Sequence, residues 1–335
     1  MRGSKPQNLV IPALLILACV CASSHAQIGQ IEKGAVTAEQ ERYTAPPGTA
    51  QFVPPAKGFA WQMTCIDAQA ACTVHLLTFP SPYESPCPCN NTVYAEYFRP
   101  LVKEKFPAVI VLHIAGGDFE LSRFIARQLA GNGIGALFVQ MAYYGCRRPP
   151  DNPRLRMLSE DVDLTRSAVI QTVMDIRRAG LWLSLRPEVD ANRIGIVGPS
   201  LGAMVGSLVM GVDPRLKRGA FVVGGGDLAK MIWESTLTVG AKRKMIAKGM
   251  TIETLQQKVK EVDPLTYAKN IAPQGVLMVN ARRDTVVPPA CTLELWEAMG
   301  KPEILWYDTD HVQTLAYIFE VTDKVIAHFA AKNWR

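Results

Sequence analysis

The sequence has few of the features that mark membrane-spanning, nucleic-acid-binding or zinc-binding proteins. Its apolar N-terminal stretch, 9–21, is shorter than the ~20 residues that a membrane-spanning helix needs. The basic residues are scattered apart from 242–244, so the net charge of +6 forms no dense patch of the kind that binds nucleic acid. Cys87 and Cys89 are one residue apart, with no second cysteine pair or nearby histidine to complete a zinc site. We therefore expect no transmembrane segment, no nucleic-acid partner and no metal.

The N-terminal residues have the pattern of an export signal. Arg2 and Lys5 precede the apolar stretch, and the small and polar run that follows ends at Ala26. We expect 1–26 to be a signal peptide cleaved after Ala26. The run ending at Cys19 also resembles a lipoprotein signal, in which Cys19 would carry a lipid anchor. Either reading predicts a periplasmic or secreted protein, whereas a buried N-terminal helix would need polar residues among the apolar ones.

The remaining cysteines fit an exported protein, because their number is even and an oxidising compartment permits disulfide bonds. Disulfide bonds are expected among them, with the first two close enough in sequence for a local bridge and the pairing otherwise open. They are Cys65, Cys72, Cys87, Cys89, Cys146 and Cys291.

The order of apolar runs predicts an α/β fold in a single domain at 59–335, and the hydrophobic content of 48% is enough for one large core. Residues 27–58 show little periodicity and are expected to be a loose leader. From 108 onwards, continuous β-rich runs alternate with helical stretches, which is typical of a mostly parallel, doubly wound sheet. The strand-free segment 228–270 is expected to be a helical cap insertion. There are no internal repeats.

The strongest functional signal is Gly198-Pro199-Ser200-Leu201-Gly202, which lies between a predicted buried strand and a predicted helix. A serine hydroxyl is a poor nucleophile unless it is exposed, oriented and deprotonated during attack. A sharp strand-to-helix turn exposes and orients the side chain, and glycines on either side avoid clashes in so tight a turn. This context is far more specific than the bare G-x-S-x-G pattern, and it makes Ser200 the candidate nucleophile.

The motif resembles that of the alpha/beta-hydrolase superfamily when it is taken with His113 to Gly117 upstream and with Asp284 and His311 downstream. The resemblance covers 91–335 and is nearest to dienelactone-hydrolase-like and prolyl-oligopeptidase-like esterases. The run from Tyr143 to Arg147 is also similar to a branch of the superfamily with a Tyr-Tyr-Gly-x-Arg motif. The resemblance implies an alpha/beta-hydrolase fold.

Asp284 is the candidate acid, because it follows a buried strand and should reach the sheet edge where the serine turn lies. Asp308 and Asp310 are rivals, but they are so close in sequence to His311 that we expect them to shape its loop. Of the five histidines, His311 alone follows the last strand and precedes the last helix. The order Ser, Asp, His matches that of the hydrolases.

The other site residues follow from what an acyl-transfer reaction needs. Developing negative charge on the substrate oxygen requires donors already in place, and we expect the N–H groups of Leu201 and Ala115, with Gly116 as the alternative to Ala115. Tyr143 and Tyr144 are predicted to bind substrate, although core aromatics would have the same pattern.

Two further groups have less specific patterns. Arg147 and Arg148 are either solvated or face an acidic substrate group. Met231, Trp233 and Met245 either form an apolar cap wall or pack among the helices.

These residues predict a serine hydrolase that cleaves small-molecule carboxylic esters through an acyl-serine intermediate, without a cofactor. Alternatives are a peptidase or thioesterase of the same fold, or a catalytically silent binding protein built on it.

Overall fold

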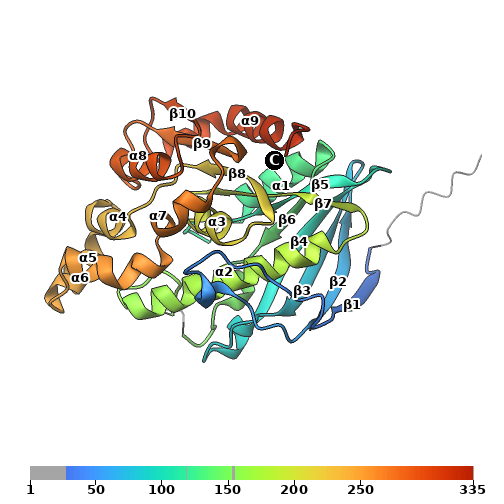
Figure 1. The fold of residues 1–335 in the computed structure, drawn as a ribbon, viewed down its shortest axis with the longest axis horizontal. Coiled ribbons are helices and arrows are strands. Elements are labelled where there is room, and N and C mark those ends of the chain that lie inside the picture. Colours follow the sequence, from blue (N-terminus) through green and yellow to red (C-terminus); the bar gives the residue numbers. More distant parts are fainter. Residues whose placement is uncertain (1–27, 118, 153–154, 335) are drawn as a thin grey trace, which may run out of the picture.

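The computed structural model describes residues 28–117, 119–152 and 155–334 (Figure 1). The expected signal peptide, with its cleavage site at Ala26 and the lipidation site at Cys19, lies outside these residues. None of the helices in the described part of the chain combines the length and the hydropathy that crossing a bilayer requires.

One ten-stranded sheet forms the centre of the molecule, with the strand order β1-β2-β3-β4-β6-β5-β7-β8-β9-β10. The strands are β1 (Ile31–Val36), β2 (Phe59–Ala68), β3 (Cys72–Pro80), β4 (Thr92–Pro100), β5 (Phe106–Val111), β6 (Gly135–Val139), β7 (Val189–Pro199), β8 (Leu216–Val222), β9 (Val276–Ala281) and β10 (Glu303–Tyr307). The first four strands are antiparallel, β4 pairs antiparallel with β6, and all pairs from β6 to β10 are parallel. The predicted α/β fold class is confirmed.

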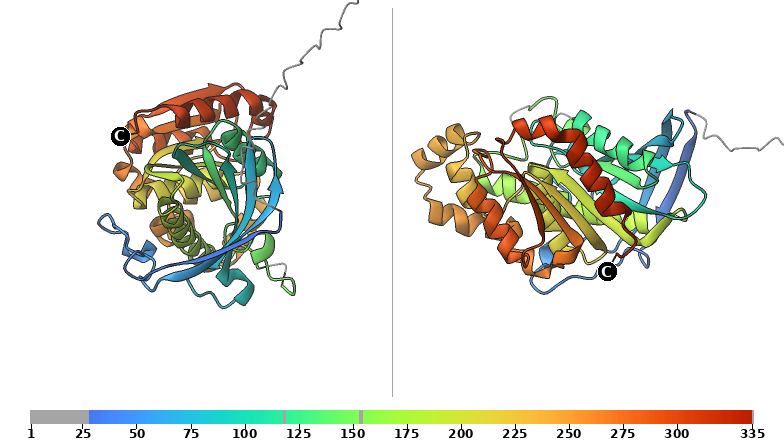
Figure 2. Two further views of the ribbon diagram at one scale, coloured as in Figure 1. Left: turned by 90° about the vertical axis from the view of Figure 1, so that its right-hand side faces the viewer. Right: turned by 90° about the horizontal axis from the view of Figure 1, so that it is seen from above.

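Helices cover both faces of the parallel half (Figure 2). α1 (Glu120–Gly131) and α9 (Ile318–Ala330) pack on one face, and α2 (Val162–Ser184), α3 (Leu201–Val212) and α8 (Pro289–Ala298) on the other. Every residue of β5, β6 and β9 is buried, which is the reason these strands read as continuous apolar runs in the sequence.

Helices also fill the segment between β8 and β9, where 228–270 was expected to form a cap. They are α4 (Leu228–Glu234), α5 (Val239–Ala247), α6 (Ile252–Val259) and α7 (Pro264–Tyr267), drawn yellow to orange at one end of the molecule in Figure 1. Two exposed ion pairs join this group to the start of α2: Lys244 Nζ lies 3.1 Å from Glu160 Oε1, and Lys258 Nζ lies 2.9 Å from Asp163 Oδ2.

The part of 27–58 that the structure describes differs from the loose leader that the sequence predicted. β1 pairs with β2 along all six of its residues, and Phe52 is completely buried. The buried carboxylate of Glu41 accepts a 2.8 Å hydrogen bond from Arg178 Nε on α2. The segment is therefore attached to the domain by a strand pair and a buried ion pair, neither of which produces a periodic apolar pattern.

The expected disulfide bonds are absent, because all six cysteines of the described residues are free thiols. In the β2–β3 register Cys65 lies opposite His75, so Cys72 is displaced by three residues, roughly 10 Å along the strand. That offset exceeds the Cα–Cα span that a disulfide bond can bridge. The Sγ atoms of Cys87 and Cys89 are 3.1 Å apart, well beyond the S–S bond length of about 2.05 Å.

Candidate active site

Ser200 lies at the turn between β7 and α3, in a backbone conformation that residues other than glycine rarely adopt. Its φ is 53° and its ψ is −117°, and its N–H donates a 2.8 Å hydrogen bond to the Val222 carbonyl on β8. A side chain on Gly198 would overlap the backbone of Gly202, so the strand and the helix approach this closely only because Gly198 has none. The turn holds the serine hydroxyl at the carboxyl end of the parallel sheet.

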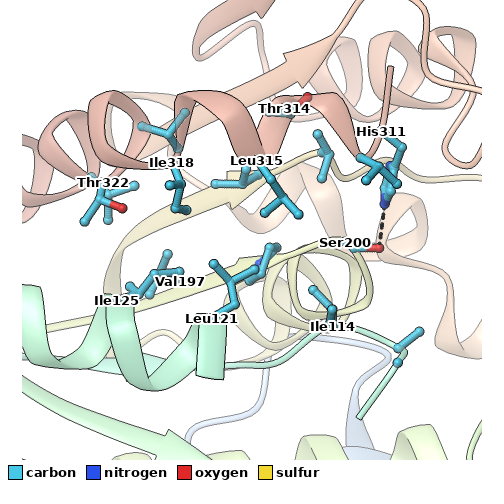
Figure 3. A pocket seen from close by; sticks show the side chains of 18 of the residues that line it. Ile114, Leu121, Ile125, Val197, Ser200, His311, Thr314, Leu315, Ile318 and Thr322 are labelled. Carbon is cyan, nitrogen blue, oxygen red and sulfur yellow. Dashed lines mark hydrogen bonds between the residues drawn. The ribbon is translucent and has the colours of Figure 1, made fainter. Parts of the chain in front are cut away.

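His311 connects Ser200 to Asp284 by two hydrogen bonds. Its Nε2 lies 3.0 Å from Ser200 Oγ, and its Nδ1 lies 2.7 Å from Asp284 Oδ2 (Figure 3 shows the bond to Ser200). The other oxygen of Asp284, Oδ1, accepts 2.8 Å hydrogen bonds from the N–H groups of Val286 and Val287. The structure therefore brings the three predicted side chains together, and the backbone fixes the orientation of the carboxylate.

The rival aspartates are engaged elsewhere. Asp310 Oδ1 accepts hydrogen bonds from the N–H groups of Val312 (2.9 Å) and Gln313 (2.7 Å), which shapes the loop that carries His311. The side chain of Asp308 is 76% exposed and faces Arg283 at 3.4 Å.

The two residues predicted to supply oxyanion donors both lie beside Ser200. Leu201 is the first residue of α3, where the helix dipole presents its positive end. Ala115 lines both of the cavities that meet at Ser200, and the alternative donor, Gly116, lines one of them. The described residues thus bring both predicted donor segments to the cavities that contain Ser200.

His113 holds the loop that carries Ala115, a contact that the sequence motif alone does not reveal. His113 Nδ1 donates to the Ile114 carbonyl at 2.8 Å, and Nε2 accepts from the Met141 N–H at 3.1 Å. Burial lowers the pKa of His113 to about 4, so the ring is neutral at pH 7 and can accept one bond while donating the other. The ring of Tyr144 packs edge-on against it at 4.6 Å.

Tyr143 and Tyr144, which the sequence predicts to bind substrate, line neither of the two cavities that contain Ser200. Tyr143 is 4% exposed and belongs to the core, and Tyr144 supports His113. Arg147, the last residue of the Tyr-Tyr-Gly-x-Arg motif, is not solvated and lines neither cavity. It is completely buried and pairs with Asp175 at 2.7 Å, which anchors the loop to α2.

Two cavities meet at Ser200, and both are also lined by Ala115 and Leu237. The first, which we call the α9 cavity, has a volume of about 190 Å³ and lies between α1 and α9, with Leu121, Ile125 and Ile318 in its wall (Figure 3).

The second, which we call the cap cavity, has a volume of about 340 Å³ and lies under α4, α5 and α6. Met231 and Met245 line it, as expected of a cap wall, whereas Trp233 packs its ring against Lys242 Nζ at 5.0 Å. Among the residues that the structure describes, no group of three or more metal-binding side chains is present.

Known proteins are similar to this chain in sequence and in fold. Residues 81–218 match the family described as "Alpha/beta hydrolase domain containing 18". Proteins of two Mycobacterium tuberculosis strains, each named only as an uncharacterized protein, are 29% identical over 227 residues, which is 66% of this chain. That alignment covers 53% of each of them, so the chain spans about half the length of these relatives.

Solved structures extend the likeness to most of the fold. An acetyl xylan esterase from Paenibacillus sp. R4 superposes with a TM-score of 0.67 and 18% identity, covering 87% of this chain and 97% of the esterase. An acylaminoacyl peptidase from Pyrococcus horikoshii superposes with a TM-score of 0.61 and 17% identity, covering 83% of this chain and 47% of the peptidase. Fold and sequence together confirm the resemblance to the alpha/beta-hydrolase superfamily.

Proposed function

We propose that the protein is a serine hydrolase that cleaves carboxylic esters of small, uncharged molecules. The observation that carries the proposal is the hydrogen-bonded series Ser200–His311–Asp284 at a strained strand-to-helix turn. The names of the fold neighbours, which are esterases and a peptidase, support a hydrolase function.

The proposed reaction proceeds in two half-reactions. His311 Nε2 accepts the Ser200 hydroxyl proton while Oγ forms a bond to the ester carbonyl carbon, and the N–H groups of Ala115 and Leu201 stabilise the resulting oxyanion. His311 then gives the proton to the leaving alcohol oxygen as the C–O bond breaks. Water repeats these steps on the acyl-serine and releases the acid. Asp284 holds the tautomer with Nδ1–H, so that Nε2 is free to accept a proton.

The lining of the cavities favours an uncharged substrate over a peptide or an anionic one. Across the described residues, neither cavity is lined by a lysine or an arginine that would bind a carboxylate. Glu160 is the one acidic side chain that the described residues contribute to either lining, and it is already paired with Lys244 at 3.1 Å. A charged group in these cavities would therefore lose its hydration without a free partner in the lining.

A fluorophosphonate probe tests the proposal directly, because it labels an activated serine irrespective of the natural substrate. We expect labelling at Ser200, no labelling of Ser200→Ala, and a loss of at least ~10³ in kcat for that variant on methyl butyrate. Ser207→Ala is the matched control, since Ser207 lies on the same helix and its hydroxyl donates to the Met204 carbonyl at 3.0 Å. An unlabelled wild-type protein would instead be a silent binding protein. If Ser200 is labelled but the protein cleaves amides or thioesters and not esters, the proposed substrate class is wrong and the cleaved class takes its place.

A further inference from the structure

Exposed apolar side chains lie at the mouth that the two cavities share. Leu237, in the turn between α4 and α5, lines both cavities and is 72% exposed. Val312 and Leu315 line the α9 cavity, Leu158 lines the cap cavity, and all three are exposed as well. Soluble proteins gather exposed apolar side chains mainly where another apolar surface binds. The entrance to the candidate active site therefore has the composition of a docking surface.

Helix α5 extends this surface and adds basic side chains to it. Val239, Lys242, Arg243 and Ile246 are spaced i, i+3, i+4 and i+7, so they lie on one face of the helix. Val239 and Ile246 are 45% and 50% exposed, and Arg243 is exposed too. We call these four residues, together with Leu237, the α5 patch. Figure 1 shows its helix at one end of the molecule.

The basic side chains of the α5 patch have no acidic partner among the described residues. The sequence has no aspartate or glutamate in 235–252. The ion pairs of the described residues include Lys244, which lies on another face of α5, but neither Lys242 nor Arg243. Lys242 Nζ instead donates to the Trp233 carbonyl at 2.9 Å and lies 5.0 Å from the centre of the Trp233 ring. The patch and its neighbouring tryptophan thus combine apolar surface with two positive charges that no described carboxylate neutralises.

An anionic lipid bilayer is the partner that matches this composition. Helices that lie on membrane surfaces carry exposed apolar and aromatic side chains beside lysine and arginine, and they bind anionic lipid more tightly than neutral lipid. A second copy of the chain would bring the same positive charges against the patch, and like charges across an interface lower the affinity. We propose that the α5 patch docks on anionic phospholipid and that the mouth of both cavities then faces the bilayer.

The position of the patch connects docking with the candidate active site. The Thr236 N–H donates a 3.0 Å hydrogen bond to the Thr285 carbonyl, which joins the turn of Leu237 to the loop that carries Asp284. A docked molecule therefore holds the entrance of its cavities at the lipid phase. Uncharged esters concentrate in that phase because their apolar groups leave water. Docking itself requires no catalysis, so a failure of the proposed function would leave this inference intact.

Binding to vesicles tests the proposal, with Cys19→Ser in every protein so that no lipid anchor contributes. Sedimentation compares vesicles of phosphatidylcholine alone with vesicles that also contain about 30% phosphatidylglycerol. We expect tighter binding to the anionic vesicles at low ionic strength and a smaller difference at high ionic strength, because salt screens the charges.

Two variants of the α5 patch separate its charge from its apolar surface. Arg243→Glu reverses one charge, and each charge near an anionic surface contributes roughly fivefold in affinity, so binding to anionic vesicles should weaken about 25-fold. Val239→Ser combined with Ile246→Ser removes apolar surface and should weaken binding to both kinds of vesicle by about tenfold.

Substitutions of the same kind outside the patch serve as matched controls. Arg42→Glu reverses an exposed charge between β1 and β2, and Ile66→Ser removes a side chain on β2 that is 45% exposed. Both control variants should bind vesicles as the protein with an intact patch does. Melting curves establish that every variant is folded.

Three vesicle results would overturn the proposal: no binding to anionic vesicles, equal binding to both kinds of vesicle, or a loss of binding in Arg42→Glu as great as that in Arg243→Glu. Light scattering without vesicles tests the other occupant. If the protein self-associates and Arg243→Glu changes that association, a second copy covers the patch and the proposal is wrong.

Discussion

The hydrogen bonds of Asp284 determine how an asparagine in its place would be oriented. Oδ1 accepts bonds from two backbone N–H groups, those of Val286 and Val287. An asparagine must keep its oxygen there, because its NH₂ group has no acceptor capacity. The NH₂ group then faces His311 Nδ1 in place of the carboxylate oxygen, which now lies 2.7 Å away. Nδ1 becomes the acceptor and the ring proton moves to Nε2, so His311 can no longer accept the Ser200 proton.

We expect Asp284→Asn to cause a large loss of kcat and a small loss in the free energy of unfolding. The wrong tautomer costs about 10⁴ in kcat in serine proteases, and the same loss is expected here because the backbone prevents the amide from turning over. Both backbone hydrogen bonds survive but lose their charge assistance, about 1 kcal/mol each, so the free energy of unfolding should fall by about 2 kcal/mol.

The assay is kcat on an activated butyrate ester at pH 7.5, with the free energy of unfolding measured by urea titration. Asp308→Asn and Asp310→Asn serve as matched comparisons and should retain kcat within about tenfold, since neither carboxylate bonds to His311. A near-normal kcat for Asp284→Asn, or a greater loss for Asp310→Asn, would refute the reasoning about the fixed carboxylate.

Three other predictions concern stability and export. Burial lowers the pKa of His113 from about 6.5 to about 4, so its contribution to stability is complete above pH 6.5 and declines as the pH falls, because the unfolded state binds the proton first. Lowering the pH from 7.5 to 5 should therefore reduce the free energy of unfolding by about 2 kcal/mol through His113 alone. His113→Gln should remove this part of the pH dependence, and an unchanged pH dependence in that variant would contradict the prediction. Arg147→Met leaves the buried carboxylate of Asp175 unpaired and should destabilise the fold by about 3–5 kcal/mol, and a change below 1 kcal/mol in urea titration would show that the pair is unimportant. The mature protein should begin at Gln27 or at a lipidated Cys19 outside the cytoplasm, and intact mass on protein from the native host decides between them, with a full-length cytosolic chain contradicting both.

The site was largely predictable from the sequence because its parts follow strands with strong local patterns. The second half of the strand before Ser200, 194–199, is apolar and buried throughout, and Asp284 follows another buried strand, so both side chains were expected at the same sheet edge. His311 follows the last strand in the same way. The hydrogen bonds among the three residues join positions up to 111 residues apart in the sequence. The order of the strands in the sheet brings these positions together.

The features that the sequence did not predict depend on partners far along the chain. β1 has an exposed, irregular burial pattern, so nothing in its residues indicates that it pairs with β2. Arg147 is buried because Asp175, which is 28 residues away, neutralises it. The local bridge between Cys65 and Cys72 fails because of strand register, which is set by pairing and not by spacing.

The division of the sheet into an antiparallel half and a parallel half has a consequence for how the protein folds. β1 to β4 pair between neighbours in the chain, whereas β5 to β10 require crossovers, and contacts between distant residues form slowly because the chain must first lose entropy. Ser200, Asp284 and His311 all belong to the slower half. Recovery of ester hydrolysis during refolding should therefore lag behind the recovery of secondary structure, which would make the site itself a reporter of the last step of assembly.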